Sequence, residues 1–278
     1  MTDTHALDAS PAELARIAAD IAVAVGTRIM ELRELGVTVA ASKSSITDVV
    51  TAADREAEQL VVTALQGARP HDAILGEEGT GIAGTSGITW VIDPIDGTVN
   101  YLYNIPMYAV SIAATVADTT AMADGRRAIA GAVYCPRLAE LYEAWESGGA
   151  RLNGAPLTIS GKSDLETALV GTGFGYTVER RIEQAAMVSR ILPRIRDIRR
   201  SGSAAYDLCA YAAGRLDAFF ERGLQPWDYA AAALILRESG GALLGQDDST
   251  PPGEPLLFAA APSLVHELRS VVLGLPSE

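Results

Sequence analysis

The sequence predicts a layered protein of helices and β-sheets, of the α+β or α/β class. Apolar residues follow helical spacing from Ser10 to Gly36, which indicates a long amphipathic helix. Runs of strand-like composition between residues 109 and 145 are separated by turn residues, which favours an antiparallel sheet. Strands and helices alternate in the second half, which is typical of an α/β layer.

The bulk composition is that of an ordinary globular protein. The chain has 278 residues, of which 49% are hydrophobic and 21% charged, so one or two subdomains around a continuous core are expected. The net charge of −13 argues against a nucleic-acid partner, because phosphate backbones favour clustered lysine and arginine. A solvated acidic surface accounts for most of this charge.

The cysteines and the N-terminus predict a cytoplasmic protein. Cys135 and Cys209 are too few for a disulfide framework in a chain of this size, and both are expected to be reduced. Residues 1–10 contain acids and lack the positive and apolar regions of a signal peptide. No apolar run approaches the ~20 residues of a membrane span, so no membrane partner is expected.

Two capping boxes mark helix starts in the first quarter of the chain. Ser10-Pro11-Ala12-Glu13 opens the first helix, and Thr51-Ala52-Ala53-Asp54 opens a second that ends near Gly67. A carboxylate in the first helical turn is favourable by itself. Asp54 can therefore be explained without any chemistry.

Two adjacent acids follow the next apolar run, Ile74 to Gly76. Glu77 and Glu78 point in different directions in any local structure, so they are expected to have different roles. The segment from Gly79 to Gly87 is rich in Gly, Ser and Thr and is predicted to be a surface loop.

The most informative stretch is the apolar run from Ile88 to Ile92 and the acids that follow it. The run fits a buried strand, and Asp93 and Asp96 come directly after it. Two carboxylates at the end of a buried strand are costly unless a positive group lies between them, and Mg²⁺ takes such oxygen ligands. Backbone N–H groups of Gly97 and Thr98 open a predicted helix and suit a phosphate. Metal and phosphate in one turn indicate phosphoryl chemistry.

Turn signals divide the strands that follow. Asp124-Gly125 is expected to be a hairpin turn, and Gly148-Gly149 and Asn153-Gly154 are further turns. We expect a subdomain boundary here, with residues 1–148 forming an N-terminal α+β part and residues 149–278 a C-terminal α/β part. The expected strands are 109–116, 128–134 and 138–145 in the first part, and 168–172, 197–200, 217–221 and 256–260 in the second.

Helices separate the strands of the second part. The expected helices are 178–195, a helix capped by Ser203 that runs to Gly214, one that opens at Pro226, and one that starts at Pro262. Residues 171–175 resemble the glycine-rich motif of dinucleotide-binding proteins. Tyr176 stands where the third glycine of that motif belongs, so a turn is the better explanation. Asp228 lies in a first helical turn, and its position alone leaves a structural role and a ligand role open.

Other catalytic classes find little support. The histidines, His5, His71 and His266, lie outside every motif, so catalysis by histidine is not expected. No Gly-x-Ser-x-Gly motif is present to support a serine hydrolase.

Three acidic motifs, in this order and spacing, carry a resemblance to a known family. They are Gly76-Glu77-Glu78, Asp93-Pro94-Ile95-Asp96-Gly97-Thr98 and Pro226-Trp227-Asp228-Tyr229-Ala230-Ala231. From about Lys43 to Gly241 the sequence resembles the inositol monophosphatase family of Mg²⁺-dependent, lithium-sensitive sugar-phosphate phosphatases. The resemblance implies an αβαβα sandwich, a homodimer, and two to three Mg²⁺ ions in each active site.

The resemblance also implies roles for individual residues. Glu77, Asp93 and the carbonyl of Ile95 would bind a first metal, and Asp93, Asp96 and Asp228 a second. Asp54 and Thr98 would orient the attacking water, with Glu77 supporting the chemistry. Lys43 and Glu78 would lie near the metals. The residues that would contact the substrate are Asp96, Gly97, Thr98, Gly202, Ser203, Ala204, Glu221 and Asp228.

The implied function is hydrolysis of a phosphomonoester, myo-inositol 1-phosphate, to inositol and phosphate by metal-activated water. Glu221 favours an inositol substrate, because inositol-hydrolysing members have an acid there. Fructose 1,6-bisphosphate, histidinol phosphate and 3′-phosphoadenosine phosphate are the alternatives within the family.

Two other types of protein remain as alternatives to this function. A haloacid-dehalogenase-type phosphatase requires two aspartates two residues apart, whereas Asp93 and Asp96 are three apart with Pro94 between them. A non-catalytic relative kept for binding or assembly would usually lack some of the ligands that are intact here.

Overall fold

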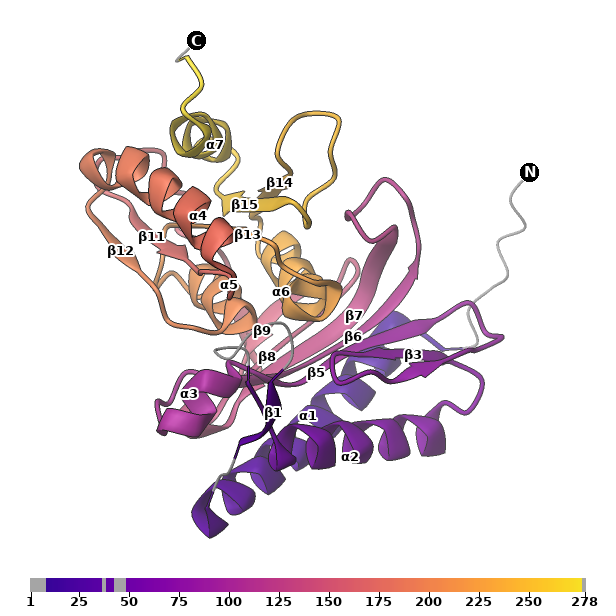
Figure 1. Ribbon diagram of the computed structural model, residues 1–278. Helices are drawn as coiled ribbons and strands as arrows, with labels where there is room; N and C mark the ends of the chain where they lie inside the picture. The colour runs from indigo at the N-terminus through magenta and orange to yellow at the C-terminus, as the bar shows by residue number, and fades with distance from the viewer. Residues whose placement is uncertain (1–8, 37–38, 43–48, 277–278) are drawn as a thin grey trace.

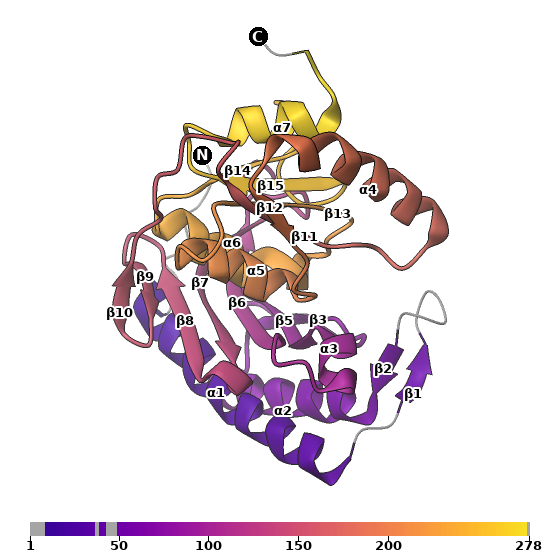
Figure 2. The same cartoon turned by 90° about the vertical axis from the view of Figure 1, so that its left-hand side faces the viewer.

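The computed structural model describes residues 9–36, 39–42 and 49–276. Lys43, a candidate residue near the metal site, lies outside the described residues. Helices and strands are stacked in five layers (Figure 1). Helices α1 and α2 cover the outer face of a large sheet, α5 and α6 lie between this sheet and a second one, and α4 and α7 cover the far side (Figure 2). The expected αβαβα sandwich is therefore confirmed.

The α-helices begin close to the predicted signals. Ser10 and Thr51 form the predicted capping boxes. Each side chain accepts a hydrogen bond from the N–H of the acid three residues later, and the carboxylate of that acid accepts one from the N–H of the capping residue. Ser203 caps α5, as expected. The helices are α1 (Pro11–Leu35), α2 (Ala52–Ala68), α3 (Thr98–Tyr103), α4 (Val178–Ile191), α5 (Ala204–Ala212), α6 (Pro226–Glu238) and α7 (Val265–Leu273).

The first sheet has eight strands in the order β10-β9-β8-β7-β6-β5-β3-β4. All neighbours are antiparallel except β3 and β5, which are parallel. The strands are β3 (Ala73–Gly76), β4 (Gly81–Ile82), β5 (Thr89–Asp96), β6 (Ala109–Ala117), β7 (Arg126–Cys135), β8 (Glu140–Trp145), β9 (Gly149–Leu152) and β10 (Ala155–Leu157). A separate antiparallel pair joins β1 (Val39–Ser42) to β2 (Val49–Thr51).

The second sheet has five strands in the order β12-β11-β13-β15-β14. Strand β11 is parallel to both neighbours, whereas β15 is antiparallel to both of its own. The strands are β11 (Leu169–Thr172), β12 (Asp197–Arg199), β13 (Ala218–Arg222), β14 (Ala242–Leu244) and β15 (Leu256–Ala260).

Three apolar clusters fill the spaces between the layers. One lies between α1, α2 and the first sheet and includes the fully buried Trp90. The second, around α5 and α6, is rich in alanine, so the two helices approach the first sheet closely. The third lies under α4 and α7 and includes the stacked rings of Phe220 and Phe258. Burial of these apolar faces is the main force that holds the layers together.

Several boundaries differ from those predicted. Strand β5 continues through Asp93 to Asp96, because β6 pairs with it beyond the apolar run, with an irregular register between the two acids. Strand β4 lies in the segment expected to be a loop. Asp124-Gly125 ends an eight-residue connection rather than forming a two-residue hairpin turn. Helix α4 gives way to a 3₁₀ turn (Leu192–Arg194), and α7 begins three residues after Pro262.

The expected turn at Asn153-Gly154 is confirmed. Both residues have positive φ, 49° and 81°, and they join β9 to β10 directly. These two strands belong to the first sheet, although they follow the expected boundary at residues 148 and 149. The division into two subdomains between residues 148 and 149 stays a prediction.

Cys135 and Cys209 are both buried and both free. Among the described residues, none of the helices combines the length and the apolar character that crossing a membrane requires.

Candidate active site

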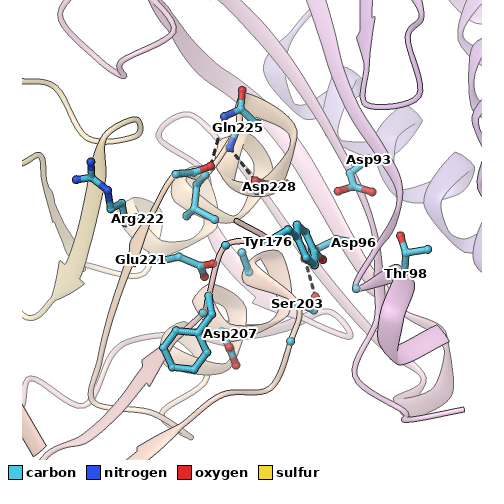
Figure 3. Close-up of a pocket in the computed structure, with 18 of the residues that line it drawn as sticks. Asp93, Asp96, Thr98, Tyr176, Ser203, Asp207, Glu221, Arg222, Gln225 and Asp228 are labelled. Carbon is cyan, nitrogen blue, oxygen red and sulfur yellow. Dashed lines mark hydrogen bonds between the residues drawn. The ribbon is translucent and has the colours of Figure 1, made fainter. Parts of the chain in front are cut away.

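A cavity of about 500 Å³ lies between the end of strand β5 in the first sheet and the ends of strands β11 and β13 in the second. The end of β5 and the start of α3 form one wall, and α5, β13 and the start of α6 form the other (Figure 3). Most of the candidate site residues come together here, although Glu77 and Asp228 lie 151 positions apart in the sequence. The candidates in the lining are Glu77, Asp93, Ile95, Asp96, Gly97, Thr98, Gly202, Ser203, Ala204, Glu221 and Asp228.

Three carboxylates form the centre of this site. Asp93, Asp96 and Asp228 each offer an oxygen, and these oxygens lie within 4.8 Å of one another. Asp93 is 1% exposed and Asp96 8% exposed, and Asp228 is partly buried. Such a group of carboxylate oxygens fits the ligand preference of a hard divalent cation.

The electrostatics of the cluster favour a bound positive charge. Burial raises the pKa of Asp93 well above its usual range, and the charges of Glu77, Asp96 and Asp228 raise it further. Burial likewise raises the pKa of Asp228, followed by the charges of Asp96 and Glu77. Because like charges this close disfavour each other's ionisation, a bound cation would stabilise the ionised forms. The residues therefore fit a metal such as Mg²⁺.

The carboxylate of Asp96 is fixed by the start of helix α5. Ser203 Oγ donates a hydrogen bond of 2.6 Å to Asp96 Oδ2 (Figure 3). The Ala205 N–H donates another, of 2.7 Å, to the same oxygen. Burial raises the pKa of Asp96 to about 6, and these hydrogen bonds oppose the increase. The helix start thus orients one oxygen of Asp96 over a sequence separation of more than 100 residues.

Asp228 both caps its helix and belongs to the carboxylate cluster. Its Oδ2 accepts a 2.7 Å hydrogen bond from the Gln225 N–H and completes a capping box at the start of α6. The same side chain reaches the cluster with Asp93. The capping role expected for Asp228 is therefore confirmed, and its place in the cluster is compatible with the ligand role, which stays a prediction.

Asp54 and Thr98 are joined directly. Thr98 Oγ1 donates to Asp54 Oδ1 at 3.0 Å and lies 3.2 Å from the Ile95 carbonyl oxygen. The other carboxylate oxygen of Asp54 accepts from Thr51, at 2.5 Å from the hydroxyl and 2.8 Å from the N–H. The helix cap therefore holds this buried carboxylate in one orientation, with Thr98 at the cavity wall.

The adjacent glutamates separate, as their positions in the sequence suggested. Glu77 lines the cavity and acts electrostatically on Asp93, although it lies outside the compact three-carboxylate group. Glu78 is outside the cavity lining. Its N–H donates 2.8 Å to Glu58, a buried acid on α2 that also accepts from the N–H and hydroxyl of Thr80. Sequence reasoning missed Glu58, which holds the turn that carries Glu77.

Two glycines allow the cavity walls to approach each other. Gly97 has φ of 94°, and a Cβ there would lie 3.1 Å from the carbonyl oxygens of Gly202 and Met107. Gly202 has φ of 95°, and its Cβ would lie 2.8 Å from the side chain of Asn100. Asn100 Nδ2 donates to the carbonyls of Met107 (2.5 Å) and Ser201 (2.7 Å), so it ties the two walls together.

The far end of the cavity contains two further acids. Burial raises the pKa of Glu221 to about 8, and the charges of Asp207 and Asp96 contribute. Burial raises the pKa of Asp207 to about 7, and its Oδ1 has no hydrogen-bond partner. A Cβ at Gly173 would lie 2.1 Å from Glu221 Oε1, so the glycine run after β11 makes room for this carboxyl group. Sequence reasoning missed Asp207, although a lone acid in the apolar run of α5 was a usable signal.

Comparisons with known proteins agree with this geometry. Residues 10–272 match the model of the inositol monophosphatase family. The chain is 44% identical over 240 residues to the inositol-1-monophosphatase SuhB of Mycobacterium tuberculosis, covering 83% of this chain and 80% of that protein. It is 38% identical over 227 residues to the Nus factor SuhB of Escherichia coli, covering 81% of this chain and 82% of that protein.

A solved structure is similar over nearly the whole chain. The extragenic suppressor protein SuhB of Bartonella henselae superposes with a TM-score of 0.84 at 30% sequence identity. The match covers 94% of this chain and 98% of the other.

Proposed function

Because this chain belongs to the inositol monophosphatase family, we propose that it is a Mg²⁺-dependent phosphatase that hydrolyses myo-inositol 1-phosphate. The observation that carries the proposal is the approach of Asp93, Asp96 and Asp228 within 4.8 Å in the wall of a 500 Å³ cavity. The 44% identity to an inositol-1-monophosphatase supports the inositol substrate in particular.

The carboxylate cluster supports the metal sites that the family resemblance implies. Glu77, Asp93 and the Ile95 carbonyl would hold one Mg²⁺, and Asp93, Asp96 and Asp228 a second, with a third as a further possibility near Glu77. When bound, the ions supply positive charge that activates water and offsets the charge of the phosphate. The pKa values of Asp93 and Asp228 are raised in the metal-free protein, which supports a site that is stabilised by the positive charge of bound metal ions.

The remaining chemistry belongs to the chain itself. The paired Asp54 and Thr98 would orient the water that attacks phosphorus, since their hydrogen bond fixes the hydroxyl at the cavity wall. The N–H groups of Gly97 and Thr98 would hold phosphate oxygens. Because water attacks phosphorus directly in this proposal, no covalent enzyme intermediate is required.

The end of the cavity beyond the carboxylate cluster would bind the inositol ring. Gly202, Ser203 and Ala204 form one side of it and Glu221 another. Carboxyl groups accept hydrogen bonds from hydroxyls, so Glu221 suits a polyol. Asp207 adds a second acid at this end, outside the set that the sequence indicated.

A substrate panel tests this proposal. The values of kcat/KM would be ranked for myo-inositol 1-phosphate, fructose 1,6-bisphosphate, histidinol phosphate, 3′-phosphoadenosine phosphate and 2-glycerophosphate, all in MgCl₂. We expect the inositol phosphate to rank first. If another substrate had a kcat/KM tenfold or more above that of the inositol phosphate, the protein would be a phosphatase with that other substrate.

A second candidate is a binding or assembly function, because one relative at 38% identity is named a Nus factor. Phosphate release from any substrate of the panel separates this candidate from the first. The cytoplasmic location, the homodimer and the lithium sensitivity expected from the sequence are also proposals. Light scattering in solution would test the dimer.

A further inference from the structure

A second, smaller cavity of about 190 Å³ lies away from the acidic cluster, at the opposite end of helix α3. Thr98 begins this six-residue helix at the acidic cavity, and Asn104, which caps its other end with φ of 59°, lines the small cavity. The other lining residues are Met30, Arg33, Glu34, Tyr108 and Arg137. They come from the last turns of α1, the residue just before β6 and the 3₁₀ turn Pro136–Leu138.

The wall of this small cavity contains unsatisfied hydrogen-bond donors. Tyr108 is completely buried, and its hydroxyl has no hydrogen-bond partner. Arg33 Nε is also buried without a partner. A buried donor without a partner is unfavourable, so native structures usually supply one from protein, water or a ligand.

The cavity is also positively charged. Neither Arg33 nor Arg137 forms an ion pair with any of the described residues. Glu34 is the one carboxylate in the lining, and it is exposed. The exposed Arg137 and the partly buried Arg33 line the same small cavity, and two guanidinium groups there favour an anion.

The geometry of the aromatic residues holds the donors in place. Arg33 lies over the ring of Tyr101, 5.9 Å from its centroid, and Tyr101 meets Tyr108 edge to face at 5.2 Å. The Tyr101 hydroxyl donates 2.8 Å to the Ile29 carbonyl and anchors the group on α1. Burial raises the pKa of Tyr108, and the charges of Arg137 and Arg33 oppose this increase. The Tyr108 hydroxyl therefore stays protonated, as a donor, and the charges of both arginines act on it.

We propose that this cavity binds a small phosphate-type oxyanion, held by the Tyr108 hydroxyl and the guanidinium groups of Arg33 and Arg137. A tetrahedral oxyanion offers acceptors in several directions, which suits donors that converge from three separate elements. The oxyanion is either free inorganic phosphate or the phosphate group of a small organic molecule. The site is independent of the acidic cavity and of the reaction proposed for it.

Calorimetric titration of the full-length protein, dialysed free of metal, with inorganic phosphate at constant ionic strength tests the proposal. Without metal, the clustered carboxylates of the acidic cavity repel anions, so the heat reports on the small cavity. We expect saturable binding that Arg137→Gln weakens by about tenfold or more, because a charged hydrogen bond is lost. Glu34→Gln should tighten binding, because it removes the opposing charge.

Two further variants make the result specific. Tyr108→Phe removes only the hydroxyl, so it should weaken binding without lowering the melting temperature. Arg194→Gln is the matched control, because Arg194 is exposed and lies outside both cavities. A parallel titration with 2-glycerophosphate identifies the source of the oxyanion, since the tighter of the two ligands is the better match. Absence of saturable binding, or binding that is the same in Arg137→Gln and Arg194→Gln, would overturn the proposal.

Discussion

Thr98 Oγ1 donates a 3.0 Å hydrogen bond to Asp54 Oδ1, which joins the start of α3 to the start of α2 across 44 residues of sequence. The helix cap at Thr51 occupies the other oxygen of Asp54. A carboxylate bound on both sides has little rotational freedom. This pair is therefore suited to hold a water molecule in a fixed direction.

The first prediction concerns this pair. Asp54→Asn should lower kcat by about 10²-fold or more, the usual scale for groups that move or orient protons. Metal affinity should change little, because Asp54 lies outside the carboxylate cluster. Thr98→Ser should retain most activity, and Thr98→Val should lose it, since only the serine keeps the hydroxyl. Loss of Mg²⁺ binding in Asp54→Asn, with a normal rate at saturating metal, would contradict the assignment.

The second prediction concerns substrate choice. Glu221→Ala should lower kcat/KM for myo-inositol 1-phosphate about tenfold to a hundredfold more than for 2-glycerophosphate, which lacks ring hydroxyls. Glu221→Gln keeps the size and an acceptor, so its loss should be smaller. Equal losses on both substrates would show that Glu221 supports the fold or the metal site instead.

The third prediction concerns the pH dependence of the metal-free protein. The folded-state pKa of Glu221 is about 8 and that of Asp207 about 7, whereas the ordinary values are 4.5 and 3.8. The folded state therefore holds these protons more tightly than the unfolded state. The resulting stabilisation is complete below pH 4 and is lost as the pH rises through 7 and 8.

Denaturant unfolding in EDTA measures this effect. The free energy of unfolding should be lower at pH 8 than at pH 5, and Asp207→Asn should raise it at pH 8 while changing it little at pH 5. Asp20→Asn is the control, because Asp20 is a strongly exposed acid on α1. If Asp207→Asn destabilised the protein equally at both pH values, Asp207 would be a purely structural residue.

The fourth prediction concerns lithium. Li⁺ is close to Mg²⁺ in size but carries one charge, so it is expected to replace the ion held by Asp96 and Asp228 after hydrolysis and to leave phosphate trapped. LiCl should then inhibit uncompetitively with substrate, relative to KCl at equal ionic strength. Inhibition should weaken in any Asp96→Asn or Asp228→Asn variant that retains activity. Identical rates in the two salts up to tens of millimolar would remove lithium sensitivity from the account.

Local signals in the sequence predicted the helices well. The capping boxes at Ser10 and Thr51 depend on residues three positions apart, so they can be read without the tertiary structure. The short strands β1, β2 and β14 were missed, because three or four residues carry too little periodicity. The extension of β5 depends on its partner β6, which no local pattern shows.

The residues of the site likewise divide into those with a local sequence signal and those that depend on tertiary structure. The acidic motifs at Glu77, Asp93 and Asp228 could be found because each combines acids with a helix or strand boundary. Asp207 and Glu58 were missed, because their burial depends on tertiary packing; the apolar neighbours of Asp207 in α5 were a local signal that was not used. The small cavity around Tyr108 was missed for a similar reason, since its donors come from separate elements and form no motif.

Phosphate release from myo-inositol 1-phosphate, measured in MgCl₂ and again in EDTA, tests the central claim most directly. Asp93 lies at the centre of the cluster, so Asp93→Asn should lose the Mg²⁺-dependent activity while its circular dichroism stays that of the wild type. We expect phosphate release in MgCl₂ but not in EDTA, and from the wild type but not from Asp93→Asn. Equal release in EDTA, or undiminished activity in Asp93→Asn, would contradict it.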